Sequence, residues 1–217
     1  MAEVEVKDLV IYGAGGLGRE ILSLIRRDYA DKWRVIGFIS DGENLPSSVD
    51  GIKLLPKSFL NDTTVAVVLG FADTKGKALL FDELKQKGNL SFPNIISTRA
   101  SVAANVDLGM GIVIQDFCIV SVNVHIGNAV FLNAYSSLGH DVKICDFCTL
   151  MPSVNVSGYA SVGECTMIGA QSFLLQGKTI GDNVTVAAGS KIFNDIPDNV
   201  TVFGNPASIL RNKSYNY

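Results

Sequence analysis

The segment HIGNAVFLNAYSSLGHDVKICDFCTL, residues 125–150, carries an aliphatic residue at every sixth position, beginning with Ile126. The same spacing extends without a break in both directions, and every position of the series is Ile, Leu or Val: Ile96, Val102, Leu108, Ile114, Val120, Ile126, Leu132, Leu138, Ile144, Leu150, Val156, Val162, Ile168, Leu174, Ile180, Val186 and Ile192. The residue after each of these anchors is usually small. A period of six fits neither a helix nor one alternating strand, but it is typical of a short strand and a turn that repeat. We therefore expect an all-β parallel β-helix here, and an ordinary sandwich or barrel of short strands is the alternative.

Proteins with hexapeptide repeats, which this stretch resembles, place three hexads in each coil and form a left-handed triangular prism. The 97 residues from Ile96 to Ile192 would then make a little over five coils. We expect each anchor to point into a shared interior, where stacked coils bury aliphatic surface. The small residue after it turns the corner, where backbones of neighbouring coils crowd.

The residues before the repeat predict an α/β domain. Residues 7–13, KDLVIYG, predict a buried parallel strand that runs into the glycine turn GAGGLG at 13–18 and then into a helical pattern. Further strands are expected at 34–39 and 64–70, and a helix at 75–87. A strand, a glycine turn and a helix in this order let backbone N–H groups approach a phosphate. A tight structural turn without a ligand is the alternative.

This pattern divides the chain into two domains. Residues 1–92 predict a Rossmann-like nucleotide-binding domain that is shorter than a full dinucleotide fold, which favours a nucleotide or nucleotide sugar over NAD. Residues 93–217 predict the β-helix with a C-terminal cap, because the proline-containing segment after Ile192 can cover the open edge of the last coil. The N-terminal domain is expected to cap the other end.

Composition excludes several classes of protein. The net charge of −3 and the pI near 5.3 argue against a nucleic-acid footprint. No apolar run approaches the ~18 residues of a membrane span, and the N-terminus lacks the layout of a secretory signal, so we expect a cytoplasmic protein. Cys145 and Cys148 form a C-x-x-C, but no second such pair or histidine pair accompanies it. We interpret Cys118 and Cys148 as small core residues and expect no metal.

The two histidines, His125 and His140, occupy different positions in the repeat. His140 lies two residues after an anchor, at a corner, and Asp141 follows it; Gly158, 18 residues on, would stack over it and leave room. An imidazole beside a carboxylate is a candidate general base, and a corner residue without a role is the alternative. His125 precedes Ile126 and should face outward from a strand, so we assign it no role.

The chain resembles the NeuD/PglD family of sugar acyltransferases over nearly its whole length. The motifs that carry the resemblance are YGAGGLGRE at 12–20, GFISD at 37–41, LG at 69–70, LGHD at 138–141 and VFGNPA at 202–207. Family members acetylate a nucleotide-linked amino sugar or a sialic acid. The resemblance implies an enzyme of surface glycan biosynthesis that uses acetyl-CoA to N-acetylate a nucleotide amino sugar. Sugar O-acetylation and a non-catalytic nucleotide-sugar-binding scaffold are the alternatives.

The resemblance also implies roles for individual residues, with His140 as the base and Asp141 as the residue that raises its basicity. The expected contacts to the nucleotide sugar are Gly15, Gly16, Leu17, Ser40, Asp41, Gly70 and Asn133, and the expected contacts to acetyl-CoA are Thr149, Gly158 and Ala188. Three positions depart from the family pattern. Leu17 and Thr149 stand where the family often has His, and Ser40 stands where it often has Asp. Thr149 offers only a hydroxyl near the thioester.

The implied assembly is a homotrimer in which acetyl-CoA lies between neighbouring prisms. Outward apolar residues of the repeat agree with such an assembly, because cyclic closure would cover them: Val122, Phe131, Tyr135, Phe147 and Phe173. Two other enzyme classes are disfavoured. A zinc enzyme resembling the γ-class carbonic anhydrases would need three histidines, and an NAD-dependent reductase would need a larger cofactor domain. The sequence leaves open which nucleotide, sugar and acyl chain are used.

Overall fold

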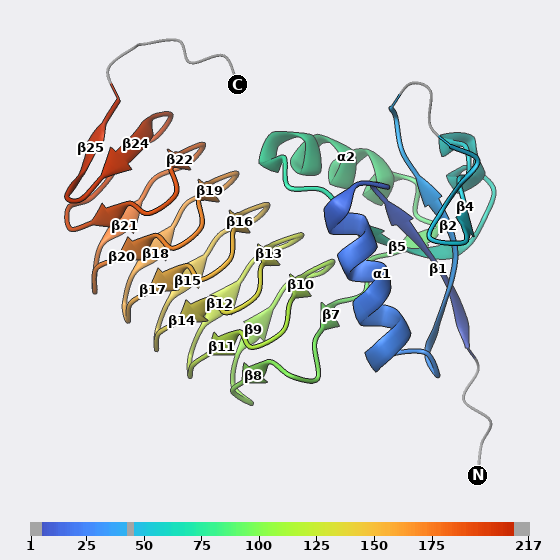
Figure 1. Ribbon diagram of the computed structural model, residues 1–217, viewed down its shortest axis with the longest axis horizontal. Helices are drawn as coiled ribbons and strands as arrows, with labels where there is room; N and C mark the ends of the chain where they lie inside the picture. The colour runs from blue at the N-terminus through green and yellow to red at the C-terminus, as the bar shows by residue number, and fades with distance from the viewer. Residues whose placement is uncertain (1–5, 43–45, 211–217) are drawn as a thin grey trace.

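A computed structural model describes residues 6–42 and 46–210, so the ends of the expected domains at 1–5 and 211–217 lie outside it. The chain forms a small α/β unit beside a stack of coils (Figure 1). The α/β unit holds a parallel sheet of four strands in the order β2-β1-β5-β6. Its strands are β1 (Lys7–Tyr12), β2 (Trp33–Ile39), β5 (Val65–Leu69) and β6 (Leu90–Ser91). The Rossmann-like fold expected for this part of the chain is confirmed.

The remaining elements of this unit connect the four strands. Helix α1 (Gly16–Asp28) joins β1 to β2, and helix α2 (Thr74–Gln86) joins β5 to β6. Between β2 and β5 lie a hairpin of β3 (Ser48–Val49) and β4 (Ile52–Lys53) and a 3-10 helix, η1 (Lys57–Leu60). Helix α1 buries an aliphatic stripe against the sheet: Ile21, Leu22, Leu24 and Ile25. No helix in the described part of the chain has the length and apolar character needed to cross a bilayer.

The repeat forms three parallel sheets in which each strand pairs with the strand 18 residues later, as Leu132 does with Leu150. Sheet 1 contains β7 (Ile95–Ile96), β10 (Val113–Ile114), β13 (Phe131–Leu132), β16 (Thr149–Leu150), β19 (Met167–Ile168) and β22 (Thr185–Val186). Sheet 2 contains β8 (Ser101–Val102), β11 (Ile119–Val120), β14 (Ser137–Leu138), β17 (Asn155–Val156), β20 (Phe173–Leu174) and β23 (Lys191–Ile192). Sheet 3 contains β9 (Asp107–Leu108), β12 (His125–Ile126), β15 (Lys143–Ile144), β18 (Ser161–Val162) and β21 (Thr179–Ile180). The parallel β-helix expected from the six-residue period is confirmed, with about six turns. Its left-handed sense is expected from the resemblance to hexapeptide-repeat proteins.

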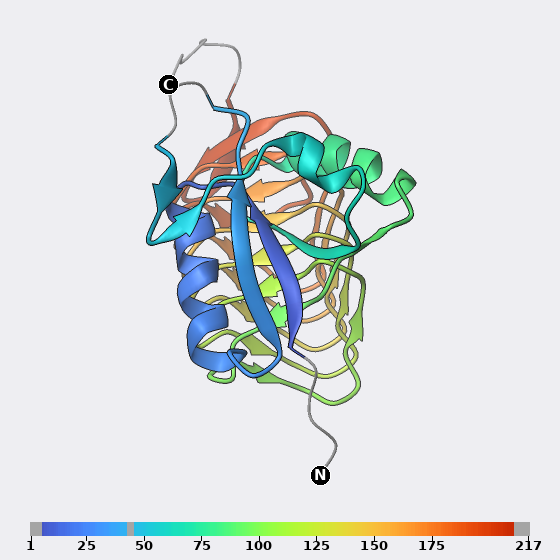
Figure 2. The same ribbon diagram turned by 90° about the vertical axis from the view of Figure 1, so that its right-hand side faces the viewer.

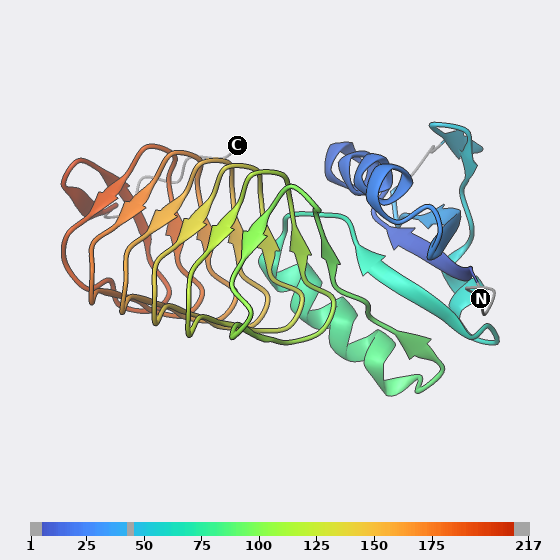
Figure 3. The ribbon, with the colours of Figure 1, turned by 90° about the horizontal axis from the view of Figure 1, so that it is seen from below.

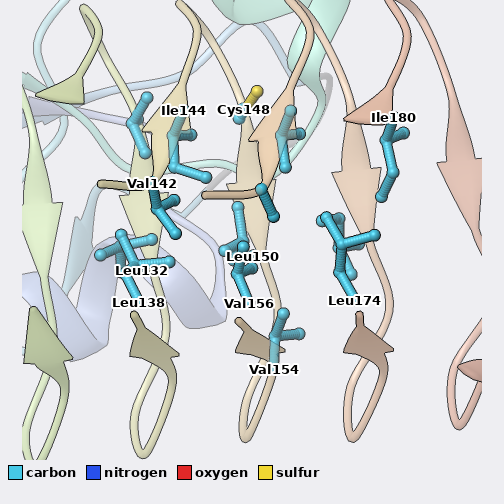
Figure 4. Packing of buried hydrophobic residues seen from close by; sticks show 14 of the residues in the cluster. Leu132, Leu138, Val142, Ile144, Cys148, Leu150, Val154, Val156, Leu174 and Ile180 are labelled. Atoms are coloured by element: carbon cyan, nitrogen blue, oxygen red, sulfur yellow. The ribbon is translucent and has the colours of Figure 1, made fainter. Parts of the chain in front are cut away.

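The anchors, together with residues two positions before an anchor such as Val142, Cys148 and Val154, form the interior of the β-helix, as Figure 4 shows for several coils. Each two-residue strand ends on its anchor, so one aliphatic side chain per strand enters the prism. Cys118 and Cys148 join this core with no exposed surface, which confirms their interpretation as small core residues. At the corners the coils touch: a Cβ on Gly139 would lie 2.5 Å from the backbone N of Gly158. Because the anchors are buried, replacing one such as Leu132 with Ala should lower the free energy of unfolding by about 2–5 kcal/mol.

The N-terminal unit packs on the side of the prism instead of across its first coil. Phe131 and Phe147, expected to face outward for a trimer, are buried against the N-terminal unit. The first-coil anchors Ile96, Val102 and Leu108 stay only partly buried, so the expected end-capping by this unit is wrong. Figure 2 shows the N-terminal sheet and helices in front of the coils, and Figure 3 shows α2 running beside the first of them.

Polar contacts fix this arrangement. Arg27 on α1 lies 2.6 Å from Asp116 at a corner of the prism. Lys77 on α2, 1% exposed, donates from Nζ to the backbone oxygens of Ala129 and Cys148, each at 3.0 Å. In the opposite direction, the hydroxyl of Thr149 donates to the backbone oxygen of Ala72 at 2.9 Å. Because α2 also lines a cavity described below, these bonds set the position of that cavity on the prism.

The far end of the β-helix is covered by a hairpin, as expected. Strand β24 (Thr201–Gly204) continues sheet 1 in parallel with β22, and β25 (Ala207–Ile209) returns antiparallel to it. Val202 is fully buried against the last coil, and Ile196 bridges to Ile180. The hairpin therefore covers the open backbone edge of sheet 1.

Candidate active site

A cavity of about 690 Å³ opens at the carboxyl ends of β1, β2 and β5. Six of the seven residues expected to contact a nucleotide sugar line it: Gly15, Gly16, Leu17, Ser40, Asp41 and Gly70. The remaining lining side chains come from β1, η1 and α2 and the loop before α2, among them Tyr12, Lys57, Phe71, Asp73 and Glu83. The carboxyl ends of parallel strands are the usual ligand edge of such a sheet.

The glycine turn shapes the floor of this cavity. A Cβ on Gly18 would lie 1.8 Å from the backbone oxygen of Gly13, so this glycine lets the helix approach the strand. Gly13 itself has a φ of +116°, which favours glycine. Gly15 and Gly16 have no atom within 4 Å of an added Cβ, so they border open space. Helix α1 begins there with no acidic residue in its first turn, and its free N–H groups suit a phosphate.

Asp41 is held by a residue that the sequence analysis did not single out. The Tyr12 hydroxyl lies 2.8 and 2.7 Å from the two carboxylate oxygens of Asp41. Burial and the neighbouring Asp41 carboxylate raise the pKa of Tyr12, so its hydroxyl stays protonated and donates. Lys57 and Glu83 pair at 2.8 Å on the cavity wall. Tyr12, Lys57 and Glu83 come from three separate elements, β1, η1 and α2. Of the three, only Tyr12 had a signal in the sequence, because it ends the strand that precedes the glycine turn.

His140 and Asp141 form the turn between β14 and β15, at the corner where sheet 2 meets sheet 3. The Nδ1 atom of His140 lies 2.9 Å from Oδ2 of Asp141, and both side chains are partly exposed. A carboxylate can only accept, so Nδ1 carries the proton of a neutral His140 and Nε2 keeps a free lone pair. Hydrogen bonds from His140 and then Asn123 hold the pKa of Asp141 below its usual value.

The coil above His140 leaves room for the imidazole. A Cβ on Gly158 would lie 2.7 Å from Nε2 of His140, so the stacking expected from the 18-residue spacing is present. Tyr159, the next residue, places its ring edge-on to the imidazole with 4.8 Å between ring centres. A base with a free Nε2, a carboxylate on Nδ1 and space beside it can accept a proton from a bound nucleophile.

His125 lies on a flat face of the prism. It belongs to β12, and its Nδ1 lies 2.7 Å from Oδ2 of Asp107 in the coil below. It does not line the cavity at the carboxyl ends of β1, β2 and β5. The pair resembles other contacts between neighbouring coils, such as Ser161 with Thr179.

The other expected contacts are spread over the prism. Asn133 and Ala188 lie in turns between sheets 1 and 2, a different corner from that of His140 and Gly158. Thr149 has no exposed surface because its hydroxyl is bonded to Ala72 in the domain interface, so the side chain has no free face for acetyl-CoA. Within residues 6–42 and 46–210, no group of three or more His, Cys, Asp or Glu side chains could hold a metal ion.

The cavity and His140 face different sides of one chain. In a three-sided prism, the corner between sheets 2 and 3 lies opposite sheet 1, and the N-terminal unit with its cavity packs against sheet 1. The described residues of a single chain therefore do not bring the expected base to the expected sugar site.

The chain was compared with family models, with curated proteins and with solved structures, and all three comparisons found acetyltransferases or their domains. Residues 8–84 match the family model of the PglD N-terminal domain. GDP-perosamine N-acetyltransferase from Escherichia coli O157:H7 is 26% identical over 217 residues, covering 93% of this chain and 95% of the relative. The acetyltransferase domain of PglB from Neisseria gonorrhoeae FA1090 in complex with acetyl coenzyme A superimposes with a TM-score of 0.87 at 25% identity, over 95% of this chain and all of that one (100%).

A third relative extends the likeness of fold. PerB from Caulobacter crescentus, in complex with CoA and GDP-perosamine, superimposes with a TM-score of 0.87 at 24% identity and covers 97% of this chain and 100% of its own. The matched N-terminal domain, the full-length relative and the shared two-part fold agree with one another. The N-terminal part of the chain thus matches the PglD N-terminal domain family, and the chain as a whole is similar over nearly its full length to acetyltransferases, one of them a GDP-perosamine N-acetyltransferase.

Proposed function

We propose that the protein transfers an acetyl group from acetyl-CoA to the amino group of a nucleotide-linked sugar. The observation that carries this proposal is the His140–Asp141 pair at a prism corner, with Nε2 free beneath Gly158. The relatives support the substrate class: the Escherichia coli relative is a GDP-perosamine N-acetyltransferase, and the Neisseria relative binds acetyl coenzyme A.

The reaction requires one proton acceptor. The sugar amine adds to the thioester carbonyl carbon, and Nε2 of His140 accepts the proton that the nitrogen loses. When the C–S bond breaks, the sulfur of CoA leaves and the proton can pass from the imidazolium to it. Asp141 stabilises the imidazolium through Nδ1, 2.9 Å away. A backbone N–H at the corner can stabilise the oxyanion, and holding amine and thioester together supplies much of the rate.

The cavity of the N-terminal unit is proposed to hold the nucleotide sugar. Its diphosphate would meet the N–H groups at the start of α1, next to Gly15 and Gly16. Asp41, with its carboxylate fixed by Tyr12, can accept hydrogen bonds from the ribose hydroxyls. Gly158 and Ala188, small residues at two corners, remain the proposed neighbours of the pantetheine arm.

We infer that the active form is a homotrimer, because one chain does not join cavity and base. Exposed apolar side chains gather on sheet 2 and the two corners that flank it: Phe117, Ile119, Val122, Tyr135, Tyr159 and Phe193. A neighbouring prism packed there would cover them and would adjoin the corners of both His140 and Asn133. Light scattering should give a species near three times 23.2 kDa, and a stable monomer at micromolar concentration would contradict the inference. We place the enzyme in the cytoplasm, where acetyl-CoA and nucleotide sugars are made.

The decisive experiment mixes the protein with acetyl-CoA and a panel of GDP-, UDP- and dTDP-linked amino sugars. A thiol reagent reports released CoA, and NMR of the product locates the acetyl group. Acetylation of a sugar nitrogen is expected. Acetylation of a hydroxyl would show an O-acetyltransferase instead. Sugar-nucleotide binding without CoA release across the panel would indicate a scaffold and contradict the proposal.

A further inference from the structure

The turns that join sheet 2 to sheet 3 stack on one another and carry a column of short polar side chains. Asn105, Asn123 and Asp141 are the third residues of three successive turns, each 18 residues from the next. Asn123 and Asp141 have φ values of 57° and 59°. Asn and Asp tolerate this left-handed conformation better than other residues with a side chain. The column therefore places an amide directly beneath the carboxylate that contacts His140.

Hydrogen bonds within the column settle which way each group points. Nδ2 of Asn123 lies 3.2 Å from Oδ1 of Asp141, and the carboxylate can only accept, so the Asn123 amide donates. This leaves Oδ1 of Asn123 facing Asn105, whose Nδ2 donates to it at 2.6 Å. The second oxygen of Asp141, Oδ2, is then the one that receives Nδ1–H of His140.

We propose that Asn123 is a positioning residue for the His140–Asp141 pair. Its amide donates a hydrogen bond to one carboxylate oxygen of Asp141 and so orients the other oxygen toward Nδ1 of His140. That contact stabilises the Nδ1–H tautomer and leaves Nε2 as the proton acceptor. The inference rests on the proposed function, because it concerns the same base. Among the described residues, the side-chain hydrogen bonds of Asn123 go to Asn105 and Asp141, and none goes to the imidazole. The effect of Asn123 passes through Asp141, which is partly exposed and would otherwise rotate into solvent.

The other neighbours of the pair do not duplicate this contact. Above the imidazole, the next turn contributes Tyr159, which packs edge-on and forms no hydrogen bond with Asp141 among the described residues. No lysine or arginine in the described ranges forms an ion pair with Asp141. The carboxylate is thus oriented by His140 and Asn123 together.

The test measures the tautomer of His140 and its turnover in the same variants. The chain has two histidines, so the imidazole nitrogens give two resolved sets of ¹⁵N signals, assigned with a His125→Gln variant. At about pH 8.5 the wild type should show the Nδ1–H form at His140. Asn123→Gly keeps the left-handed turn and removes the amide. Asn123→Asp keeps the size and removes the donor.

Both variants should shift His140 toward the Nε2–H tautomer and lower kcat about tenfold, the loss expected for one hydrogen bond to a charged group. The KM values of both substrates should stay near those of the wild type. In an Asp141→Asn background, Asn123→Gly should cause no further loss, because the two residues act in series. Asn183→Gly, at φ 55° in a turn of another corner, is the matched control and should leave kcat and tautomer unchanged.

Two results would overturn the inference: an Nδ1–H tautomer with wild-type kcat in both variants, or a lower kcat without a change of tautomer, which would show a merely structural role. Failure of the proposed function is a separate result. It would appear in the same series as full activity of His140→Ala, whatever the tautomer does.

Discussion

Replacing Gly158 with alanine adds one methyl group directly over the expected base. The new Cβ would lie 2.7 Å from Nε2 and 2.8 Å from Cε1 of His140, whereas non-bonded carbon atoms rest about 3.5–4.0 Å apart. The imidazole must therefore retreat by about 1 Å, and a misplacement of that size can lower turnover by about 10²-fold. Gly158 has no left-handed φ, so alanine fits its backbone. The imidazole is partly exposed and can move, so the free energy of unfolding should change by less than about 1 kcal/mol.

The assay follows CoA release to obtain kcat, with calorimetry for acetyl-CoA affinity because Gly158 is also a proposed neighbour of the pantetheine. Thermal unfolding should move by no more than about 4 °C. The control is Gly158→Ala in a His140→Ala background, where the clash is gone and no further loss of kcat is expected. A Gly158→Ala enzyme with wild-type turnover would refute the placement of the base beneath this glycine.

Two further predictions concern the N-terminal unit. Gly15→Val fills open space at the cavity floor, so the KM for the nucleotide sugar should rise roughly tenfold or more while acetyl-CoA affinity stays constant; an unchanged KM would contradict the assignment of the cavity. Burial lowers the pKa of Lys77 from 10.5 to about 8, so between these values the unfolded chain binds more protons and the free energy of unfolding should rise with pH. Urea unfolding at about pH 8 and pH 10 should show a smaller increase in the free energy of unfolding for Lys77→Met than for the wild type. An equal increase in both proteins would show that Lys77 does not cause it.

The β-helix could be predicted in detail because each hexad repeats one local environment. An anchor such as Leu132 is buried for the same reason as Leu150, and their pairing follows from the spacing alone. The docking of the N-terminal unit has no such periodic signal. Phe131 and Phe147 occupy outward positions of the repeat, so the pattern predicted exposure, whereas the neighbouring unit covers them. The burial of Thr149 likewise has no periodic signal, because it depends on the contact with Ala72 in the other unit.

In the candidate site, too, contacts within the repeat could be predicted from the sequence, whereas contacts between different elements could not. The stacking of Gly158 on His140 followed from counting 18 residues, and the same count would have found Asn123 beneath Asp141. The pairing of Lys57 with Glu83 could not be found that way, because a short helix and α2 meet only in the folded sheet. Within a repeat, the number of residues between two positions determines how far apart they lie in space. Between different elements it does not.

The most direct test of the account is the turnover number of His140→Ala with acetyl-CoA and the best nucleotide amino sugar. We expect a folded protein, since His140 lies in an exposed turn and no anchor changes, with kcat lowered about 10²–10⁴-fold and acetyl-CoA affinity nearly unchanged. Asp141→Asn should lower kcat less, and His125→Ala, the matched control on the flat face, should remain active. A His140→Ala enzyme with the turnover of the wild type would leave the proposed reaction without its base.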